Sequence, residues 1–97
     1  MKALKPVLVR ELIGYAEKGE LDNVVGVLVR LDKDQLAELK AVIWLGRDGH
    51  TPKHWDALVI QARAKLDKDT VQFLAEEKDL GQGLHKGLDM LEASGRI

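Results

Sequence analysis

Hydrophobic residues recur at every third or fourth position along most of the chain, a spacing that places them on one face of an α-helix. The first such stretch covers residues 6–18, and its apolar positions are Leu8, Val9, Leu12, Ile13, Tyr15 and Ala16. Pro6 suits the first turn of a helix, because the N–H that it lacks would have no partner there. Lys18 followed by Gly19 predicts the end of this helix, since a cation favours the negative helix terminus and glycine accepts a left-handed backbone.

The valine-rich stretch at residues 21–31 fits two interpretations. Its valines favour a strand by intrinsic preference. Its apolar residues nevertheless follow the helical spacing, at Leu21, Val24, Val25, Leu28 and Leu31. A single strand would have no partner elsewhere in the chain and would leave backbone groups unpaired. We therefore predict a helix, in which a mid-helix glycine costs about 1 kcal/mol relative to alanine.

The next helix is predicted from a cap at Asp32 to about Gly46. Asp32 and Gln35 have the spacing of a capping box, in which each side chain binds the other residue's backbone N–H. The helix is apolar on one face and, near its end, around most of its circumference, at Leu36, Leu39, Ala41, Val42, Ile43, Trp44 and Leu45. A helix of this kind is expected to lie at the centre of the fold.

Residues 46–50 form a predicted turn, after which Thr51 and Pro52 suit the cap and first position of a fourth helix. This helix carries its inward positions at Trp55, Leu58, Val59, Ala62 and Leu66, and Ile60 falls outside the stripe. Trp44 and Trp55 flank the turn. They could form an aromatic wall for a ligand, but the scarcity of aromatic residues, 4% of the chain, favours two core anchors that clamp the bend.

Two further helices are predicted in the C-terminal third. A short one follows a cap at Asp67 and carries Val71, Phe73 and Leu74, and a charged link at residues 76–79 follows it. The last helix places leucines on one face and ends at Gly95; the leucines are Leu80, Leu84, Leu88 and Leu91. Its glycines weaken it but would let another helix approach closely. The chain is thus predicted to be all-α, a compact bundle of about five to six short helices in a single domain, residues 1–97.

The amino-acid composition excludes several kinds of site and makes some classes of partner less plausible. The hydrophobic fraction of 45% and the charged fraction of 32% are those of a folded protein, and the net charge of −1 gives no broad attraction to nucleic acid or anionic lipid. The chain has no cysteine, which excludes disulfides and cysteine-based zinc sites. Its first residues lack the apolar run of a signal peptide or membrane span, so a cytoplasmic location is expected.

Residues 31–91 resemble a small bacterial helical domain family of unknown function. The shared features are the cap at residues 32–35, the helix that ends in Trp-Leu-Gly-Arg at residues 44–47, Thr51 and Trp55, the short helix start at residues 70–74, and Leu-x-x-Gly-Leu at residues 84–88. The family usually has Gly-Asp where this chain has Asp48-Gly49, and proline where it has Glu77-Lys78. The resemblance implies a helical domain with a shared turn and implies no reaction.

The candidate ligand-binding residues, Arg47, Asp48, His50 and His54, gather at the predicted turn. One interpretation is a pocket for an anion or a peptide carboxylate, in which Arg47 donates two hydrogen bonds and the free amides of the next helix complete the site. The other is structural: Arg47 satisfies the last carbonyls of its own helix, or pairs with Asp48 or Asp56.

Metal binding and catalysis have little support in the sequence. His50 and His54 are four apart, the spacing of metal ligands on one helix face, but His50 precedes the expected helix start and no glutamate lies nearby as a base. We predict no metal and no cofactor. The only serine is Ser94, near the end of the chain, and no phosphate-binding loop follows a strand.

The leading hypothesis is therefore a non-catalytic interaction module that binds a protein partner or itself. Three features support it: the chain is short, Ile60 lies outside the apolar face of its helix, and the glycines of the last helix would let another helix approach closely. The alternatives are a helix-turn-helix-like nucleic-acid-binding protein and a small ligand-binding protein or enzyme that uses the turn from Arg47 to His54. Nucleic-acid contacts would come from Lys53, Gln61, Arg63 and Lys65, but the long turn and the slightly negative charge count against them.

Overall fold

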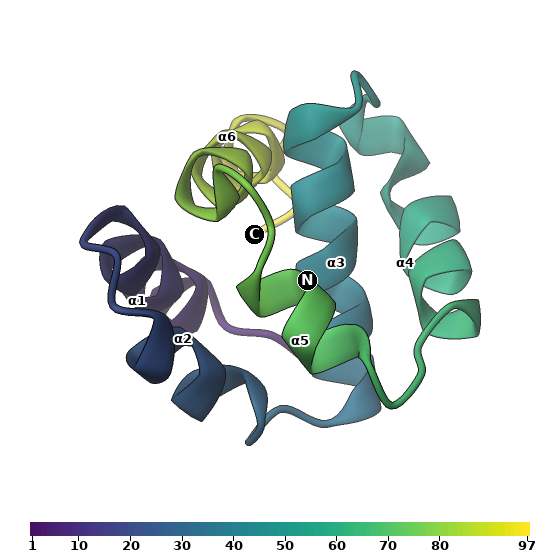
Figure 1. Ribbon diagram of the computed structural model, residues 1–97. Coiled ribbons are helices and arrows are strands. Elements are labelled where there is room, and N and C mark those ends of the chain that lie inside the picture. Colours follow the sequence, from purple (N-terminus) through teal and green to yellow (C-terminus); the bar gives the residue numbers. More distant parts are fainter.

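The computed structural model describes residues 1–97 and contains six α-helices and no β-strand (Figure 1). The helices are α1 (Pro6–Glu17), α2 (Leu21–Leu28), α3 (Lys33–Arg47), α4 (Trp55–Ala64), α5 (Thr70–Ala75) and α6 (Leu80–Ala93). A single turn of 3₁₀-helix, η1 (Pro52–His54), precedes α4. The predicted all-α bundle is confirmed. No helix combines the length and the apolar character needed to cross a membrane.

The fold is arranged around α3. Helix α4 lies along one side of α3 and α6 packs against another, while α1 packs on α6 and α2 on both α1 and α5 (Figure 1). The inner face of α3 is at most 3% exposed, at Leu39, Ala41, Val42, Ile43 and Leu45. The leucines predicted for the last helix are buried against it. The expectation that the third helix is central follows from this apolar circumference and is confirmed.

Glycines bring the backbones of α3 and α6 into contact. A Cβ atom on Gly46 would lie 2.3 Å from the carbonyl oxygen of Gly83, and one on Gly87 would lie 2.1 Å from the carbonyl oxygen of Val42. Real side chains do not tolerate such distances, so both positions need glycine for the helices to approach this closely. The expected close approach along the last helix is confirmed, and its partner is α3.

The valine-rich segment is a helix, as predicted, because Val24, Val27 and Leu28 turn one buried face toward the core. Helix α2 ends at Leu28, three residues earlier than expected, and Leu31 lies in the connection to α3. The capping box between Asp32 and Gln35 is present in full.

Helices α4 and α5 begin later than the sequence indicated. Thr51 makes no side-chain cap to a backbone N–H, and residues 52–54 wind as the tighter 3₁₀ turn, so α4 begins at Trp55. The short helix is preceded by Asp69 and not by Asp67. Asp67 instead accepts hydrogen bonds from the Asp69 N–H, at 2.9 Å, and from the Thr70 hydroxyl, which organises the turn before α5.

The two tryptophans have different environments. Trp55 is 5% exposed and belongs to the core, as predicted. Trp44 is only partly buried and packs against the edge of the core, with the ammonium groups of Lys40 and Lys65 each 5.4 Å from its ring centroid. The expectation of two core anchors therefore holds for Trp55 and only in part for Trp44, which packs against the core and also lines a cavity between α3, α4 and α5.

A buried carboxylate holds the N-terminal segment in place. Glu38, only 6% exposed, accepts hydrogen bonds from the backbone N–H groups of Lys2, Ala3 and Leu4, at 2.9, 3.0 and 2.7 Å. The Leu4 side chain is consequently fixed in the core. Nothing in the local sequence around Glu38 indicated this arrangement.

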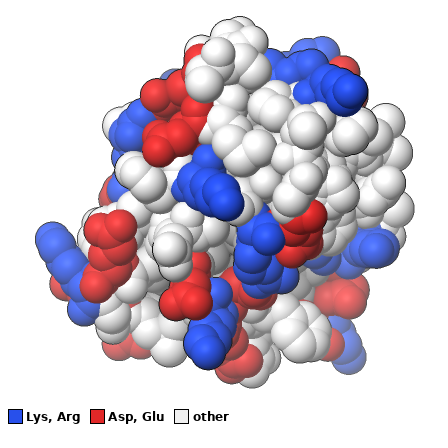
Figure 2. All heavy atoms as spheres, turned by 90° about the horizontal axis from the view of Figure 1, so that it is seen from above, with Lys and Arg blue, Asp and Glu red and all other residues white.

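The surface mixes charges of both signs. In Figure 2, Lys and Arg are interspersed with Asp and Glu, beside an area without charged groups. Large apolar side chains that stay exposed are Val7, Leu21, Val29, Ile60, Phe73 and Ile97. The exposure of Ile60 agrees with its position outside the predicted stripe.

Candidate functional site

The four residues singled out in the sequence lie together as two pairs. The Arg47 Nε lies 3.4 Å from Asp48 Oδ1 at the end of α3, and the Arg47 guanidinium also forms an ion pair with Glu77. It therefore ties the end of α3 to the connection between α5 and α6. This arrangement is close to the structural interpretation of Arg47, with Glu77 as an additional partner.

The two histidines form the second pair. The rings of His50 and His54 are edge-on, with centroids 6.4 Å apart, and Thr51 Oγ1 lies 3.4 Å from His54 Nδ1. No group of three or more histidine, aspartate or glutamate side chains is placed to hold a metal ion. Of the four candidates, Arg47 also lines a cavity, on the side of α3 that faces α4 and α5.

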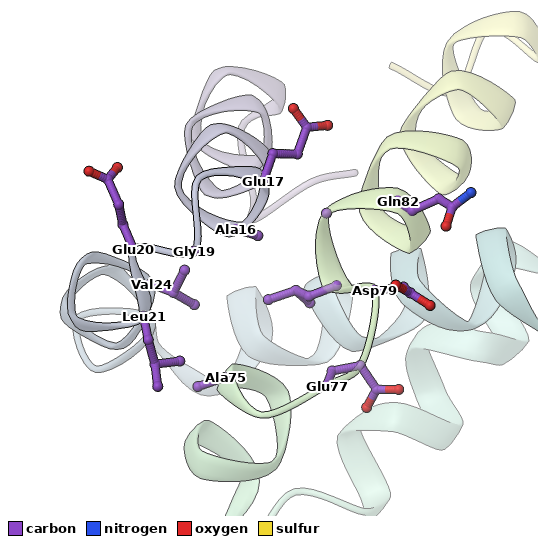
Figure 3. Close-up of a pocket in the computed structure, with 12 residues that line it drawn as sticks. Ala16, Glu17, Gly19, Glu20, Leu21, Val24, Ala75, Glu77, Asp79 and Gln82 are labelled. Atoms are coloured by element: carbon purple, nitrogen blue, oxygen red, sulfur yellow. The ribbon is translucent and has the colours of Figure 1, made fainter.

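A larger cavity, of about 430 Å³, opens between the end of α1, the start of α2, the end of α5 and the start of α6. Its apolar lining consists of Ala16, Leu21, Val24, Ala75 and Leu80. Figure 3 shows Leu21, Val24 and Ala75 directed toward the middle of this pocket. We call it the acid-rimmed pocket, because the charged residues that line it are all carboxylates: Glu17, Glu20, Glu77 and Asp79.

The rim is uneven. In Figure 3, Asp79 and Glu77 lie on the right-hand side of the pocket, whereas the carboxylates of Glu17 and Glu20 stand above it and point outward. No lysine, arginine or histidine lines the pocket. Only Glu77 has a cationic partner, Arg47, which approaches from outside. The pocket is therefore a place where a positive group is attracted over an apolar floor.

Two left-handed backbone positions shape the walls. Gly19 has φ +71° and turns the chain between α1 and α2. Asp79 has φ 57°, an uncommon value for a residue with a side chain, and turns the chain from α5 into α6. Its carboxylate makes no cap with the first amides of α6. Asp79 thus stays available at the rim, although aspartate before a helix commonly caps it.

The pKa of Tyr15, in the second half of α1, is raised by carboxylates close to its hydroxyl. Its hydroxyl donates to Glu11 Oε1 at 3.0 Å, and this hydrogen bond, together with the charge of Glu11, raises the pKa of Tyr15 above its ordinary value of 10.0. The charge of Glu20 acts in the same direction, whereas Arg30 lowers the pKa. The potential between α1 and α2 therefore favours a neutral phenol and disfavours a further anion.

A second, smaller cavity of about 220 Å³ lies between α3, the end of α4 and α5. We call it the Trp44 cavity, because the partly open indole of Trp44 forms part of its wall, together with Lys40, Arg47, Lys65 and Phe73. Glu77 lines both cavities. The connection between α5 and α6 is therefore a shared wall.

Sequence reasoning missed both cavities. The pair at residues 76 and 77 was interpreted as a charged link in solvent, and nothing in the spacing related Glu17 to Asp79 across sixty residues. The one local signal was the concentration of acidic residues at helix ends, where Glu20 and Asp79 do not cap the helices that follow them. Only the packing of α1 on α6 brings these ends together.

The chain is therefore a small all-helical domain with two surface cavities, the acid-rimmed pocket and the Trp44 cavity, both lined by residues at helix ends. Residues 21–93 match the family described as "Protein of unknown function (DUF3775)", and the chain belongs to this family. The match runs from α2 through α6 and leaves α1 outside it. No curated protein and no solved structure shows significant similarity to the chain.

Proposed function

We propose that this domain is a non-catalytic interaction module, and that its acid-rimmed pocket binds a segment of a protein partner in which basic and hydrophobic side chains alternate. The observation that carries the proposal is the combination of an apolar floor with a rim that carries only negative charge. A basic side chain fits the rim and a hydrophobic neighbour fits the floor.

Charge complementarity argues for this partner. Four carboxylates surround the pocket, those of Glu17, Glu20, Glu77 and Asp79, and Asp79 and Glu77 lie side by side on the edge next to α6 (Figure 3). Ion pairs at such an exposed rim steer the encounter and select the partner more than they add affinity. We therefore expect binding to weaken as salt screens the rim, with a Debye length of about 10 Å at 0.1 M.

The apolar floor extends beyond the pocket. Leu21 is 50% exposed, and it lines both the pocket and an adjoining groove of about 280 Å³ between α2 and α5. Ala75 also belongs to both, and Val25 and Val71 continue the apolar lining along the groove. A partner segment of several residues could therefore place successive hydrophobic side chains in the pocket and in the groove.

Carboxylates are the only ionisable side chains that line the pocket. No serine, cysteine, histidine or lysine lies beside them to complete a nucleophile–base pair, and the one cation that contacts them, Arg47, pairs with Glu77 from outside, which supports a binding role. The expected cytoplasmic location and bacterial origin stay predictions, as does self-association.

Fluorescence anisotropy with a labelled peptide of alternating leucine and lysine tests the proposal. Glu17→Gln combined with Asp79→Asn removes two rim charges and keeps the shapes of the side chains, and asparagine accepts the left-handed backbone at position 79. We expect this double variant to weaken binding by about three- to tenfold and to flatten its salt dependence.

Asp56→Asn on α4 is the matched control, because it removes an exposed carboxylate that does not line the pocket. It should leave binding unchanged. A peptide of alternating leucine and glutamate should not bind. Equal affinity of the double variant and the unmodified protein, or no saturable binding of the leucine-lysine peptide, would overturn the proposal. Light scattering across concentration separately tests self-association.

The nucleic-acid alternative has less support from the geometry. Arg63 forms an ion pair with Asp34, so one of the four contacts named for it already has a charged partner. Helix α4 packs along α3 and is reached through a separate 3₁₀ turn. Retention of the protein on heparin at low salt would revive this alternative.

A further inference from the structure

We propose that the Trp44 cavity is a second binding site, for a small ligand that combines a flat aromatic ring with an anionic group. Apart from Glu77, which lines both cavities, it stands on residues other than those that carry the proposed function, and either proposal can fail alone. Its residues come from α3, from the end of α4 and from α5, so that only the folded chain assembles it.

The aromatic part of the proposal rests on Trp44 and Phe73. Trp44 is partly open although it sits on the central helix, and Phe73 is 66% exposed on the neighbouring α5. Both rings line the cavity, and the buried side chains of Ile43 and Leu74 line it as well. An aromatic ligand would contact an indole and a phenyl group that the core leaves open to solvent.

The anionic part rests on two lysines. The ammonium groups of Lys40 and Lys65 each lie 5.4 Å from the centroid of the Trp44 ring. Neither forms an ion pair with a carboxylate in the structure, where the ion pairs involve arginines and one histidine. Two like charges beside one ring repel each other, and an anion placed near both would relieve that repulsion.

The wall carries more positive than negative charge. Three cations line it, Lys40, Arg47 and Lys65, against two carboxylates, Asp67 and Glu77. Glu77 is paired with Arg47, and Asp67 accepts hydrogen bonds from the Asp69 N–H and the Thr70 hydroxyl, so one positive charge remains in surplus in the lining. The volume of about 220 Å³ is below the about 300 Å³ at which ordinary ligand pockets begin, so the cavity encloses only the ring system and leaves the anionic group outside it, beside Lys40 and Lys65.

Two-dimensional ¹H–¹⁵N NMR tests this inference directly, because the chain has two tryptophans and therefore two indole N–H signals. Trp44→Phe assigns them. Titration with adenosine 5′-monophosphate and, separately, with benzoate should move the Trp44 signal in a saturable manner and leave the Trp55 signal in place. Adenosine alone and inorganic phosphate alone supply the ring and the anion separately, and each should bind at least about tenfold more weakly than the nucleotide.

Lys40→Gln combined with Lys65→Gln should weaken the binding of adenosine 5′-monophosphate by at least about tenfold. Lys53→Gln combined with Lys86→Gln is the matched control, since neither lysine lines the cavity, and it should change nothing. The leucine-lysine peptide should bind the Lys40/Lys65 variant as it binds the unmodified protein, which separates this inference from the proposed function.

Three outcomes would overturn the inference. The first is the absence of a saturable Trp44 shift with both probes up to about 5 mM, an affinity too weak to define a site. The second is an unchanged shift in the Lys40/Lys65 variant. The third is an equal response to inorganic phosphate alone, which would indicate simple ion pairing at surface lysines.

Discussion

Replacement of Gly87 by alanine should destabilise the protein strongly, although alanine is the better helix former. The added Cβ would lie 2.1 Å from the carbonyl oxygen of Val42, 2.9 Å from its Cγ1 and 3.0 Å from its carbonyl carbon. Ordinary contact begins at about 3.4 Å, so the Cβ is more than an ångström too close to a backbone atom that no rotamer change can move. Helices α3 and α6 must therefore separate.

The magnitude follows from three contributions. Forced separation of a packed core costs about 1–3 kcal/mol. A gap of about 0.5–1 Å also forfeits a quarter to a half of each dispersion contact, which for the fully buried leucines of α6 adds about 1–2 kcal/mol. Helix propensity returns about 1 kcal/mol. We expect a net loss of about 3 kcal/mol, and a fall in melting temperature of about 12–24 °C for a domain of this size.

Thermal and urea unfolding followed by circular dichroism at 222 nm provides the measurement. Gly26→Ala is the matched control, because Gly26 lies inside α2 and its added Cβ would meet no atom within 4 Å. That variant should gain about 1 kcal/mol from helix propensity alone. The reasoning fails if Gly87→Ala melts at or above the temperature of the unmodified protein, or if both variants shift in the same direction.

Three further predictions concern polar contacts. Glu38→Gln should lower the free energy of unfolding by about 2–3 kcal/mol in urea titrations, because one acceptor facing the N-terminal amides becomes a donor; a change below about 0.5 kcal/mol would contradict this. The single tyrosine should titrate above pH 10.0 by absorbance at 295 nm, and Glu11→Gln should return the pKa of Tyr15 toward that value. Because this pKa is raised in the folded state, its contribution to stability is present below about pH 10 and is lost as the pH rises further. Arg47→Ala should cost less than about 1 kcal/mol, because the Arg47 side chain is 45% exposed and water screens its ion pair with the less exposed Glu77; a loss of several kcal/mol would contradict this.

The features that the sequence predicted correctly are local ones. The capping box at Asp32 and Gln35 spans four residues, and the glycines at positions 19 and 95 adopt the left-handed backbone within one turn of a helix end. Such features depend on neighbours in the chain, so the residues themselves carry the information. The helical spacing of Val24 and Leu28 also outweighed the strand preference of valine, because the burial of one face decides the structure.

The features that it missed depend on contacts between distant segments. Glu38 binds amides more than thirty residues away, and the acid-rimmed pocket joins Glu17 to Asp79. Spacing also identified Trp44 and Phe73 as apolar without indicating what would cover them. How far a residue at the edge of an apolar helix face is buried depends on how the helices cross, and α3 and α6 approach each other most closely at Gly46 and Gly87. Helix α5 is short, and the rings of Trp44 and Phe73 stay partly open to solvent.

Arg47 bears on both interpretations of the turn, the anion-binding one and the structural one. Its guanidinium is tied to Asp48 and Glu77, and it lines the Trp44 cavity. Glu77 lines the acid-rimmed pocket as well, so a cation that enters this pocket competes with Arg47 for the same carboxylate. Release of Arg47 would add a positive charge beside Lys40 and Lys65, where an anion would bind more tightly. Binding at the two cavities should therefore be mutually reinforcing, because any coupling of this kind is reciprocal. The functional role of Arg47 thus depends on breaking the ion pair on which its structural role depends.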